Sequence, residues 1–483
     1  MRAPSGAEKK IGVLLRFCQR PMTNDKRPAA NREHKLSISA CPIRHRALIT
    51  AAVLLLLAAA SSAQDWIRTG TGLGVERVRL AAADFKPSTN DANNVALLKT
   101  FNDVLWNDLD NAGIFDLVSK SFYPLQGPGQ PSEVTFSAWN SPPPNTSMLA
   151  FGNLGAAAGK VTVQGWLYDV KNEKSPQVLG KQYADSATTD AVRVIAHRFA
   201  DEIIFRLGGG VPGIAETKIY FVSKRTGNKE IWMMDYDGAN QQQVTHLGSI
   251  SLSPSISPDA SRLAFSSATK NSWEIMMYSF DLNRLVSFPR LGGMNFSPSW
   301  SPDGKIAFSS SRNGYPNIYV VDASGGNSRR LTNGQGPDIS PTWNRKTGAQ
   351  IAFVSGRTGL PQIYTMEADG TNLQRVTDQG YAVSPNWSPN GQFLTFSWTR
   401  KYGPGEPGSN DLYLMDVASK QWVQLTHDAG FNDYPCWSPD GRHIVFQSHR
   451  SGRDQIWTML ADGTNVKQLT FDGANTQPNW SWK

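Results

Sequence analysis

Short runs of alternating apolar and polar residues fill the C-terminal part of this 483-residue chain. The run at 305–308 is typical: it follows a Pro-Asp-Gly turn at 302–304 and precedes a polar loop and a second strand at 318–321. A turn at 322–326 and a short strand at 329–332 complete the unit. Alternation is the period of a β-strand with one buried face, so the pattern predicts four-stranded sheets joined by tight turns.

The same unit recurs along the chain at a nearly constant spacing. Its recurring core is Ser-Pro-x-Trp-Ser-Pro-Asp-Gly, complete at 297–304 and varied elsewhere. The Trp position is occupied by Ile256, Trp300, Trp343, Trp387, Trp437 and Trp480, at spacings of 44, 43, 44, 50 and 43 residues. A period of about 40–45 residues is typical of propeller blades. The longest spacing contains a Gly- and Pro-rich insertion at 401–410, which predicts a surface loop.

The six units begin and end at different strands. The array starts with a second-type strand at Lys218 and finishes with an isolated first-type strand at 476–482. Pairing these two strands would close a ring and remove exposed sheet edges. We therefore predict an all-β six-bladed β-propeller of WD40-like repeats over 214–483, closed by the C-terminal strand. A right-handed β-solenoid is the structural alternative. We interpret the repeated tryptophans as packing within blades, and Cys436 as a small strand residue.

Residues 64–213 lack the repeat and show helical periodicity. Apolar residues recur at three- and four-residue steps over 93–112 and again over 190–207, where a Gly-Gly-Gly run ends the second helix. Residues 161–168 alternate as a strand. We predict a small α/β domain over 64–213, with a flexible N-terminal segment at 64–74.

The first 63 residues carry the whole positive excess of the chain. They hold 11 Lys and Arg against 3 acids, and subtracting these from totals of 48 and 40 leaves 37 of each. Arg44 and Arg46 precede an apolar run at 47–60 and the small residues before Ala63. This order predicts a secretory signal cleaved after Ala63. A membrane anchor is the alternative, although the run is shorter than the roughly 20 residues that span a bilayer. Residues 1–43 are long for a signal, and Met22 is an alternative start.

The neutral body that remains excludes several classes of function. It has no basic footprint for nucleic acid. Only Cys436 remains after cleavage, so we expect no internal disulfide and no lipid anchor. The turn at 235–238 resembles a calcium loop but lacks its closing Glu, because position 246 is His. With no Gly-x-Ser-x-Gly elbow and no zinc spacing of histidines, we expect no catalytic residue, metal or cofactor. A secreted propeller hydrolase or lyase acting on glycan or peptide remains the alternative.

The junction between the two regions carries a resemblance. It reads Asp-Glu-Ile-Ile-Phe-Arg-Leu-Gly-Gly at 201–209 and Gly-Ile-Ala-Glu-Thr-Lys-Ile-Tyr-Phe-Val at 213–222. Together with the signal and the six units, it resembles the TolB family of the Tol–Pal envelope system over about residues 64–483. The resemblance implies a monomeric periplasmic scaffold without enzyme activity, serving outer-membrane integrity and envelope constriction during cell division. It also implies two partners, which are the lipoprotein Pal at the propeller mouth and the C-terminal domain of TolA at the mature N-terminus.

Candidate binding residues follow from that resemblance. The TolA candidates are Gln64, Asp65, Trp66, Ile67, Arg68, Thr69 and Gly70. If the Pro/Trp strand is innermost, the loops that enter it lie on the face opposite the Pro-Asp-Gly turns. The candidate Pal-binding residues there are His246, Met294, Phe296, Asp338, Tyr381, Phe431, Asn432 and Asn475. A possible basic ring adds Arg225, Arg312, Arg357, Arg400 and Arg450. The alternative for the aromatic residues is local packing, and for the arginines it is bracing of their own loops.

Overall fold

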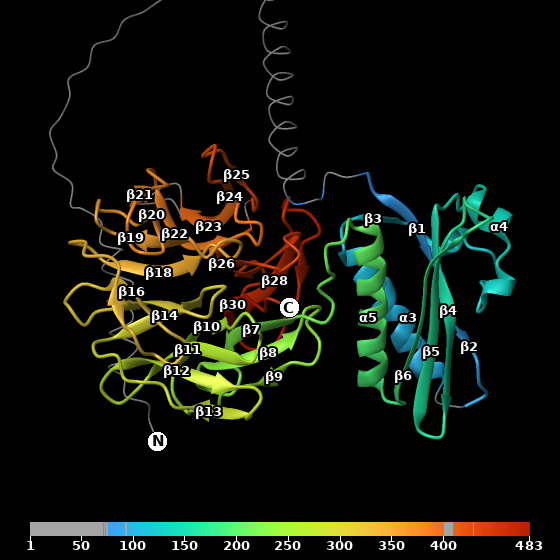
Figure 1. The fold of residues 1–483 in the computed structure, drawn as a ribbon, viewed down its shortest axis with the longest axis horizontal. Coiled ribbons are helices and arrows are strands. Elements are labelled where there is room, and N and C mark those ends of the chain that lie inside the picture. The colour runs from blue at the N-terminus through green and yellow to red at the C-terminus, as the bar shows by residue number, and fades with distance from the viewer. Residues whose placement is uncertain (1–70, 72, 74–75, 92–93, 400–408, 428) are drawn as a thin grey trace, which may run out of the picture.

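The computed structural model describes residues 71, 73, 76–91, 94–399, 409–427 and 429–483. The predicted presequence, the TolA candidates at 64–70, Arg400 and most of the 401–410 insertion lie outside the described residues. An α/β domain stands beside a β-propeller in Figure 1, with α5 nearest to the propeller. None of the described helices is long and apolar enough to cross a bilayer.

The N-terminal domain is a mixed sheet with two helices on one face. Its strand order is β3 (Phe115–Leu117), β1 (Val78–Ala82), β4 (Met148–Ala157), β5 (Lys160–Asp169) and β6 (Gln177–Ser186), and β2 (Lys86–Pro87) also pairs with β4. β1 runs parallel to β3 and β4, whereas β4, β5 and β6 are antiparallel. The helices predicted over 93–112 and 190–207 are confirmed as α3 (Asn94–Asn111) and α5 (Thr189–Leu207), and the strand predicted over 161–168 is β5.

The apolar faces of α3 and α5 pack against the sheet and form the core of the domain. Phe101 of α3 and Phe199 of α5 are fully buried in this core. Gly165 of β5 lies so close to Phe199 that a Cβ atom there would approach its ring to 2.7 Å. The opposite sheet face is covered by the segment that contains η1 (Lys120–Phe122), η2 (Pro131–Glu133) and α4 (Phe136–Asn140), through residues such as Trp139.

The C-terminal domain consists of six four-stranded antiparallel sheets arranged in a ring (Figure 1). The Pro/Trp strands are innermost, as predicted, and line a central channel. They are β10 (Ser251–Ile256), β14 (Asn295–Trp300), β18 (Asp338–Trp343), β22 (Tyr381–Trp387), β26 (Asn432–Trp437) and β30 (Asn475–Trp480). The second strands are β11 (Arg262–Ala268), β15 (Ile306–Ser310), β19 (Gln350–Ser355), β23 (Phe393–Thr399), β27 (His443–Ser448) and β7 (Lys218–Ser223).

The outer half of each blade is formed by a third and a fourth strand. The third strands are β12 (Trp273–Ser279), β16 (Asn317–Val321), β20 (Gln362–Glu367), β24 (Asn410–Asp416), β28 (Gln455–Leu460) and β8 (Glu230–Asp235). The fourth are β13 (Arg284–Val286), β17 (Arg329–Arg330), β21 (Gln374–Arg375), β25 (Trp422–Gln424), β29 (Lys467–Gln468) and β9 (Gln242–Gln243). β30 pairs with β7, which confirms the predicted ring closure by the C-terminal strand.

Every inner strand contains a β-bulge that periodicity did not predict. One residue per strand has a φ between 51° and 54°, a conformation that is uncommon outside glycine. These residues are Ser253, Ser297, Ser340, Ser384, Tyr434 and Gln477. The register with the second strand shifts at the same point in all six blades. A bulge bends its strand and re-aims the side chains, so these six positions shape the channel wall.

The N-terminal domain contacts the propeller face that carries the Pro-Asp-Gly turns. Arg442 donates from Nη2 to the carbonyl of Gly208 at 2.9 Å, and the His443 ring lies 2.7 Å from the carbonyl of Asn111. Both propeller residues lie where a first strand turns into a second. The loops that enter the inner strands lie on the opposite face.

One part of the predicted flexible segment is packed. Leu73 is only 8% exposed and lies in an apolar cluster with Phe393 and Leu460 of the propeller. Leu73 belongs to the segment predicted to be flexible, and its apolar side chain packs against the propeller. The segment from α5 to β7 spans 208–217 and contains the domain boundary predicted at Gly213.

Candidate partner-binding face and interdomain network

The face formed by the entering loops presents one of the predicted anchors prominently. Phe431, in the loop before β26, is 47% exposed. His246 is also exposed, whereas Met294 and Tyr381 are half-buried. Phe296 is half-buried and packs against Trp273, with ring centroids 5.3 Å apart. Phe431 is therefore the predicted aromatic anchor with the most surface free for a partner.

Three further exposed apolar side chains on this face were missed in the sequence. Phe471, in the loop before β30, is 70% exposed, and Tyr315 and Leu360 in two loops between second and third strands are 55% and 47% exposed. In the sequence, each of these three is a large apolar residue inside an otherwise polar loop, and this pattern could have identified them as exposed. The face thus offers apolar groups from several blades, a composition that suits the centre of a protein interface.

The predicted polar candidates of the inner strands lie beneath this surface. Asp338, Asn432 and Asn475 are fully buried, and each is the first residue of an inner strand to pair with the second strand. Asp338 accepts hydrogen bonds from Ser355 Oγ at 2.6 Å and from Arg357 Nη2 at 2.9 and 3.0 Å. This side chain braces the loop that follows β19.

Two more of the described arginines, Arg225 and Arg450, share this bracing geometry, whereas Arg312 Nη2 and Asn295 Oδ1 have no hydrogen-bond partner among the described residues. Arg450 Nη2 donates to Asn432 Oδ1 at 3.1 Å, and Arg225 Nη2 donates to Asn475 Oδ1 at 3.2 Å. The guanidinium groups of the four described arginines also lie over an aromatic ring of their blades, including Arg312 at 4.0 Å from the Tyr319 centroid. Burial lowers the pKa values of three of them, Arg225, Arg312 and Arg450.

The first full blade has Thr269 at the arginine position, and its inner strand carries Ser251 at the position of Asp338. The β22 blade has Ala382 at that position, whereas the other inner strands have Asn or Asp there. The sequence showed the arginines but not the pairing, because the two residues of a pair lie in different strands.

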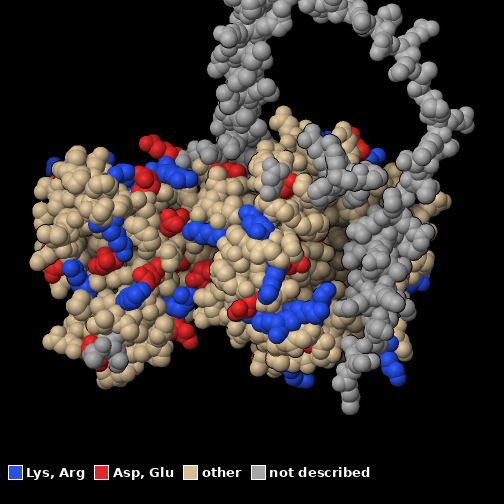
Figure 2. Space-filling view, turned by 180° about the vertical axis from the view of Figure 1, so that it is seen from behind, with Lys and Arg blue, Asp and Glu red and all other residues tan. Residues whose placement is uncertain are grey.

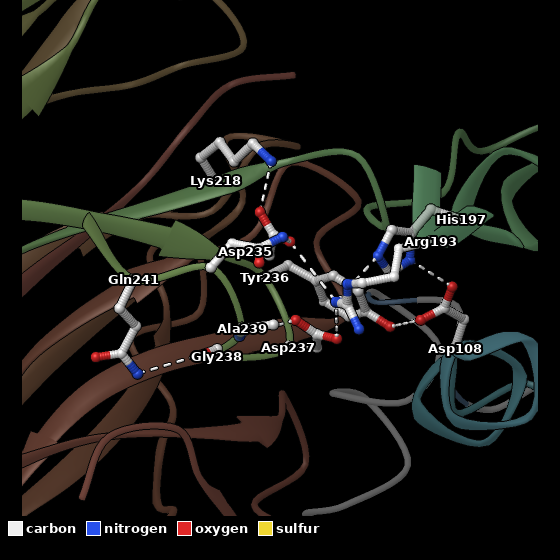
Figure 3. A network of polar contacts seen from close by, with 11 residues as sticks. Asp108, Arg193, His197, Lys218, Asp235, Tyr236, Asp237, Gly238, Ala239 and Gln241 are labelled. Atoms are coloured by element: carbon white, nitrogen blue, oxygen red, sulfur yellow. Dashed lines mark hydrogen bonds and ion pairs between the residues drawn. The ribbon is translucent and has the colours of Figure 1, made fainter. Parts of the chain in front are cut away.

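A buried polar network joins the two domains on the opposite side of the propeller (Figure 3). Asp108 of α3 is 2% exposed; its Oδ2 lies 2.7 Å from His197 Nδ1 of α5, and its Oδ1 accepts a hydrogen bond from the Tyr236 hydroxyl. Tyr236 lies in the turn between β8 and β9, so one carboxylate connects two helices of one domain with a blade of the other.

A second group of charges extends this network along the interface. Arg193 of α5 donates to Asp237 at 2.7 Å and lies 3.6 Å from Asp235, which Lys218 contacts at 2.6 Å. Burial lowers the pKa of His197, but the hydrogen bond and the charge of Asp108 outweigh it and raise that pKa above 6.5. Burial also raises the pKa of Asp108. The sequence did not predict this network.

Asp201 of α5 makes folding stability depend on pH. Burial raises the pKa of Asp201 from 3.8 to about 7, although Asp201 Oδ1 accepts a hydrogen bond from the amide of Ala215 at 3.1 Å. The folded state therefore favours the protonated acid, and this contribution is complete below the unfolded pKa and lost as pH rises through about 7.

We expect the substitution Asp201→Asn to flatten the decline in stability between pH 4 and pH 7. Urea unfolding of both proteins at several pH values measures this. Glu202→Gln, on the next residue of the same helix, is the control and should keep the slope of the unsubstituted protein. An unchanged slope in Asp201→Asn would contradict the prediction.

Surface charges give no broad field of one sign on the α/β domain. In Figure 2, Lys and Arg are interspersed with Asp and Glu over its visible surface. Within the described part of the chain, no group of three or more His, Cys, Asp or Glu residues is placed to hold a metal ion. Cys436 is a buried free thiol.

Comparison with known protein families gives two matches that together span most of the chain. The TolB amino-terminal domain profile matches residues 71–175, and the TolB beta propeller domain profile matches residues 206–404 and 378–483. The propeller profile alone covers more than half of the sequence.

Several curated relatives are similar to this chain. A TolB homolog of Chlorobium chlorochromatii is 31% identical over 271 residues, covering 56% of this chain and 59% of the relative. A TolB homolog of Chlorobium luteolum is 30% identical over 308 residues, covering 62% and 69%. The Tol-Pal system protein TolB of Desulfosudis oleivorans is 33% identical over 230 residues, covering 47% and 50%. The matched region thus spans between half and about two thirds of these relatives.

One solved structure agrees over nearly its whole length. The crystal structure of TolB from Acinetobacter baumannii superposes with a TM-score of 0.70 at 23% identity, covering 84% of this chain and 97% of that chain. At this identity the likeness supports the fold, namely an α/β domain followed by a six-bladed propeller.

Proposed function

Because the chain belongs to the TolB family of Tol–Pal system proteins, we propose that it is a monomeric periplasmic scaffold without enzyme activity. It binds Pal through the entering-loop face of the propeller and the C-terminal domain of TolA through its mature N-terminus. In this role it serves outer-membrane integrity and envelope constriction during cell division. The proposal includes removal of residues 1–63 after Ala63 and a domain division at Gly213.

The proposed binding of Pal to this face is supported by the positions of the exposed apolar side chains. Phe431 and Phe471 lie in entering loops, on the face opposite the docked N-terminal domain. Large aromatic side chains near an interface centre supply most of its binding energy when buried by a partner. The buried Asp338, Asn432 and Asn475 support these loops from beneath, so the exposed members of the candidate set make the direct contacts.

The proposed binding of TolA to the mature N-terminus is supported by the position of residues 64–70 in the chain. Residues 64–70 directly precede Thr71 and Leu73, which are buried near the domain interface. Leu73 contacts the propeller, and the Asp108 network joins the domains nearby in the fold. A partner bound at residues 64–70 would therefore lie next to residues that contact the propeller.

Calorimetric titration with the soluble domain of Pal from the same organism tests the first half. We expect saturable one-to-one binding that Phe431→Ala weakens about 30-fold, the loss that corresponds to about 2 kcal/mol at an interface anchor. The matched control is Phe205→Ala, because Phe205 on α5 is 44% exposed and lies away from the entering loops. An absence of binding by folded protein, or equal losses in both variants, would contradict the proposed site.

A second titration, with the C-terminal domain of TolA, tests the N-terminal segment. Deletion of residues 64–70 should abolish TolA binding while the truncated protein still binds Pal. A change in Pal affinity on that deletion would measure the coupling between the two sites. Retention of full TolA affinity would place that site elsewhere.

A further inference from the structure

The end of the propeller channel nearest the Pro-Asp-Gly turns is closed by an arginine. Arg345 lies between β18 and β19, in a turn where the chain departs from the Ser-Pro-Asp-Gly pattern. Its guanidinium stacks 4.7 Å from the ring centroid of Trp482, near the C-terminus. Its Nη2 lies 3.9 Å from Cys436 Sγ, on an inner strand of another blade. One cationic side chain thus reaches across the end of the channel.

Arg345 forms no ion pair with any acid of the described residues. Its Nη1 is buried and has no hydrogen-bond partner among the described residues. Burial lowers the pKa of Arg345, and only the thiol of Cys436 acts against this. By contrast, Arg357 pairs with Asp338, and Arg193 lies beside two aspartates. Arg345 as a whole is half-buried, but a buried donor atom of a cation without a partner is costly, so an anion at this position would be stabilising.

The adjoining channel wall offers hydrogen-bond donors. Asn386 Oδ1 accepts the amide of Trp437 at 3.1 Å, and Asn479 Oδ1 accepts the amide of Ile256 at 3.2 Å. Both residues line the channel, and Asn479 Nδ2 lies 3.9 Å from Cys436 Sγ, the same sulfur that Arg345 Nη2 approaches. The described residues lining the channel include Ser, Thr, Asn and Gln but neither Asp nor Glu.

From this arrangement we propose that the closed end of the channel binds a small monovalent anion, either a halide or a short carboxylate. The Arg345 guanidinium supplies the charge, and the amide groups of Asn386 and Asn479 supply further donors. Chloride and acetate are small and each carries one negative charge, which suits a single guanidinium with few donors beside it. Because the three residues come from three blades, the bound anion joins blades at the axis. This site is independent of any partner at the entering-loop face.

The first test replaces sodium gluconate by sodium chloride or sodium acetate at constant ionic strength. The melting temperature of the purified protein should rise saturably with chloride or acetate, and a response to only one of them identifies the class of anion. Arg345→Gln should abolish the rise. Lys346→Gln, at the exposed neighbouring position of the same turn, is the matched control and should retain it. A rise that persists in Arg345→Gln, or no rise in the unsubstituted protein, overturns the proposal.

A second measurement stands even if Arg345→Gln does not fold. Crystals of the unsubstituted protein soaked in sodium bromide should show anomalous scattering from bromide in contact with the Arg345 guanidinium and beside the Asn386 or Asn479 amide. If the density there fits water alone, with no anomalous signal, the channel end does not bind halide. In that case the proposal requires acetate density at the same position in crystals soaked in sodium acetate, and the absence of both anions overturns it.

Discussion

Replacing Trp480 by alanine is expected to remove about 3–5 kcal/mol from the free energy of unfolding, the usual cost of deleting a large buried aromatic side chain. Trp480 is 1% exposed and lies on the strand that closes the ring. It packs with Phe221 of the first propeller strand and Ile456 of the last complete blade. Its Nε1 also donates to Thr217 Oγ1 at 2.8 Å, so the substitution leaves a cavity and removes one hydrogen bond, while the Thr217 hydroxyl still donates to the carbonyl of Ile214.

Urea unfolding of the purified variant measures this loss. Trp480→Phe keeps most of the packing and removes only the hydrogen bond, so its cost should be about 1–2 kcal/mol. Phe471→Ala is the control from the loop before the same strand, and its 70% exposure predicts a loss within about 0.5 kcal/mol. A loss for Trp480→Ala close to that of Phe471→Ala would show that the closing strand contributes little to the stability of the ring.

Removing the carboxylate of Asp108 is the second change with a large expected effect. Asp108→Ala leaves the Tyr236 hydroxyl and the His197 ring buried without their shared partner. Breaking a buried charged pair by deleting one member typically costs about 3–5 kcal/mol. Because Tyr236 belongs to the propeller, part of this loss should appear as weaker docking of the two domains.

The matched control for this prediction lies two residues further along the same helix. Asp110 is exposed and contacts Lys467 at 3.2 Å, a surface pair whose removal should cost less than about 1 kcal/mol. Urea unfolding gives the difference in stability, and the rate of proteolysis in the segment 208–217 reports the docking. Equal effects of Asp108→Ala and Asp110→Ala on both readouts would contradict a structural role for the network.

The blade architecture could be predicted because its information is local. Each unit contains its four strands within one stretch of sequence, and the positions of Trp300, Trp343 and Trp387 mark the same place in successive units. Strand alternation and turn residues then determine the order of strands within a blade. The ring closure followed from a missing strand at one end and a surplus strand at the other, which also needs no tertiary knowledge.

The accessibility of candidate residues could not be predicted in the same way. Asp338 is the first residue of an inner strand and Phe431 lies one position before the start of another, yet one is fully buried and the other is 47% exposed. The difference depends on whether the residue pairs with the second strand or lies in the loop before it. Asp338 lies opposite Ser355 and beneath Arg357, a pairing between strands that the local pattern does not contain.

By itself, the sequence determined the two-domain order, the six blades, their closure and the helices of the α/β domain, because periodicity and turn chemistry act over a few neighbouring residues. Only the tertiary structure decided which side chains meet across the chain. Asp108 is 89 residues from His197 and 128 from Tyr236, and Arg345 meets Cys436 from 91 residues away. Burial and charge compensation arise where distant segments pack together, so these groups acquire their environment only in the folded protein.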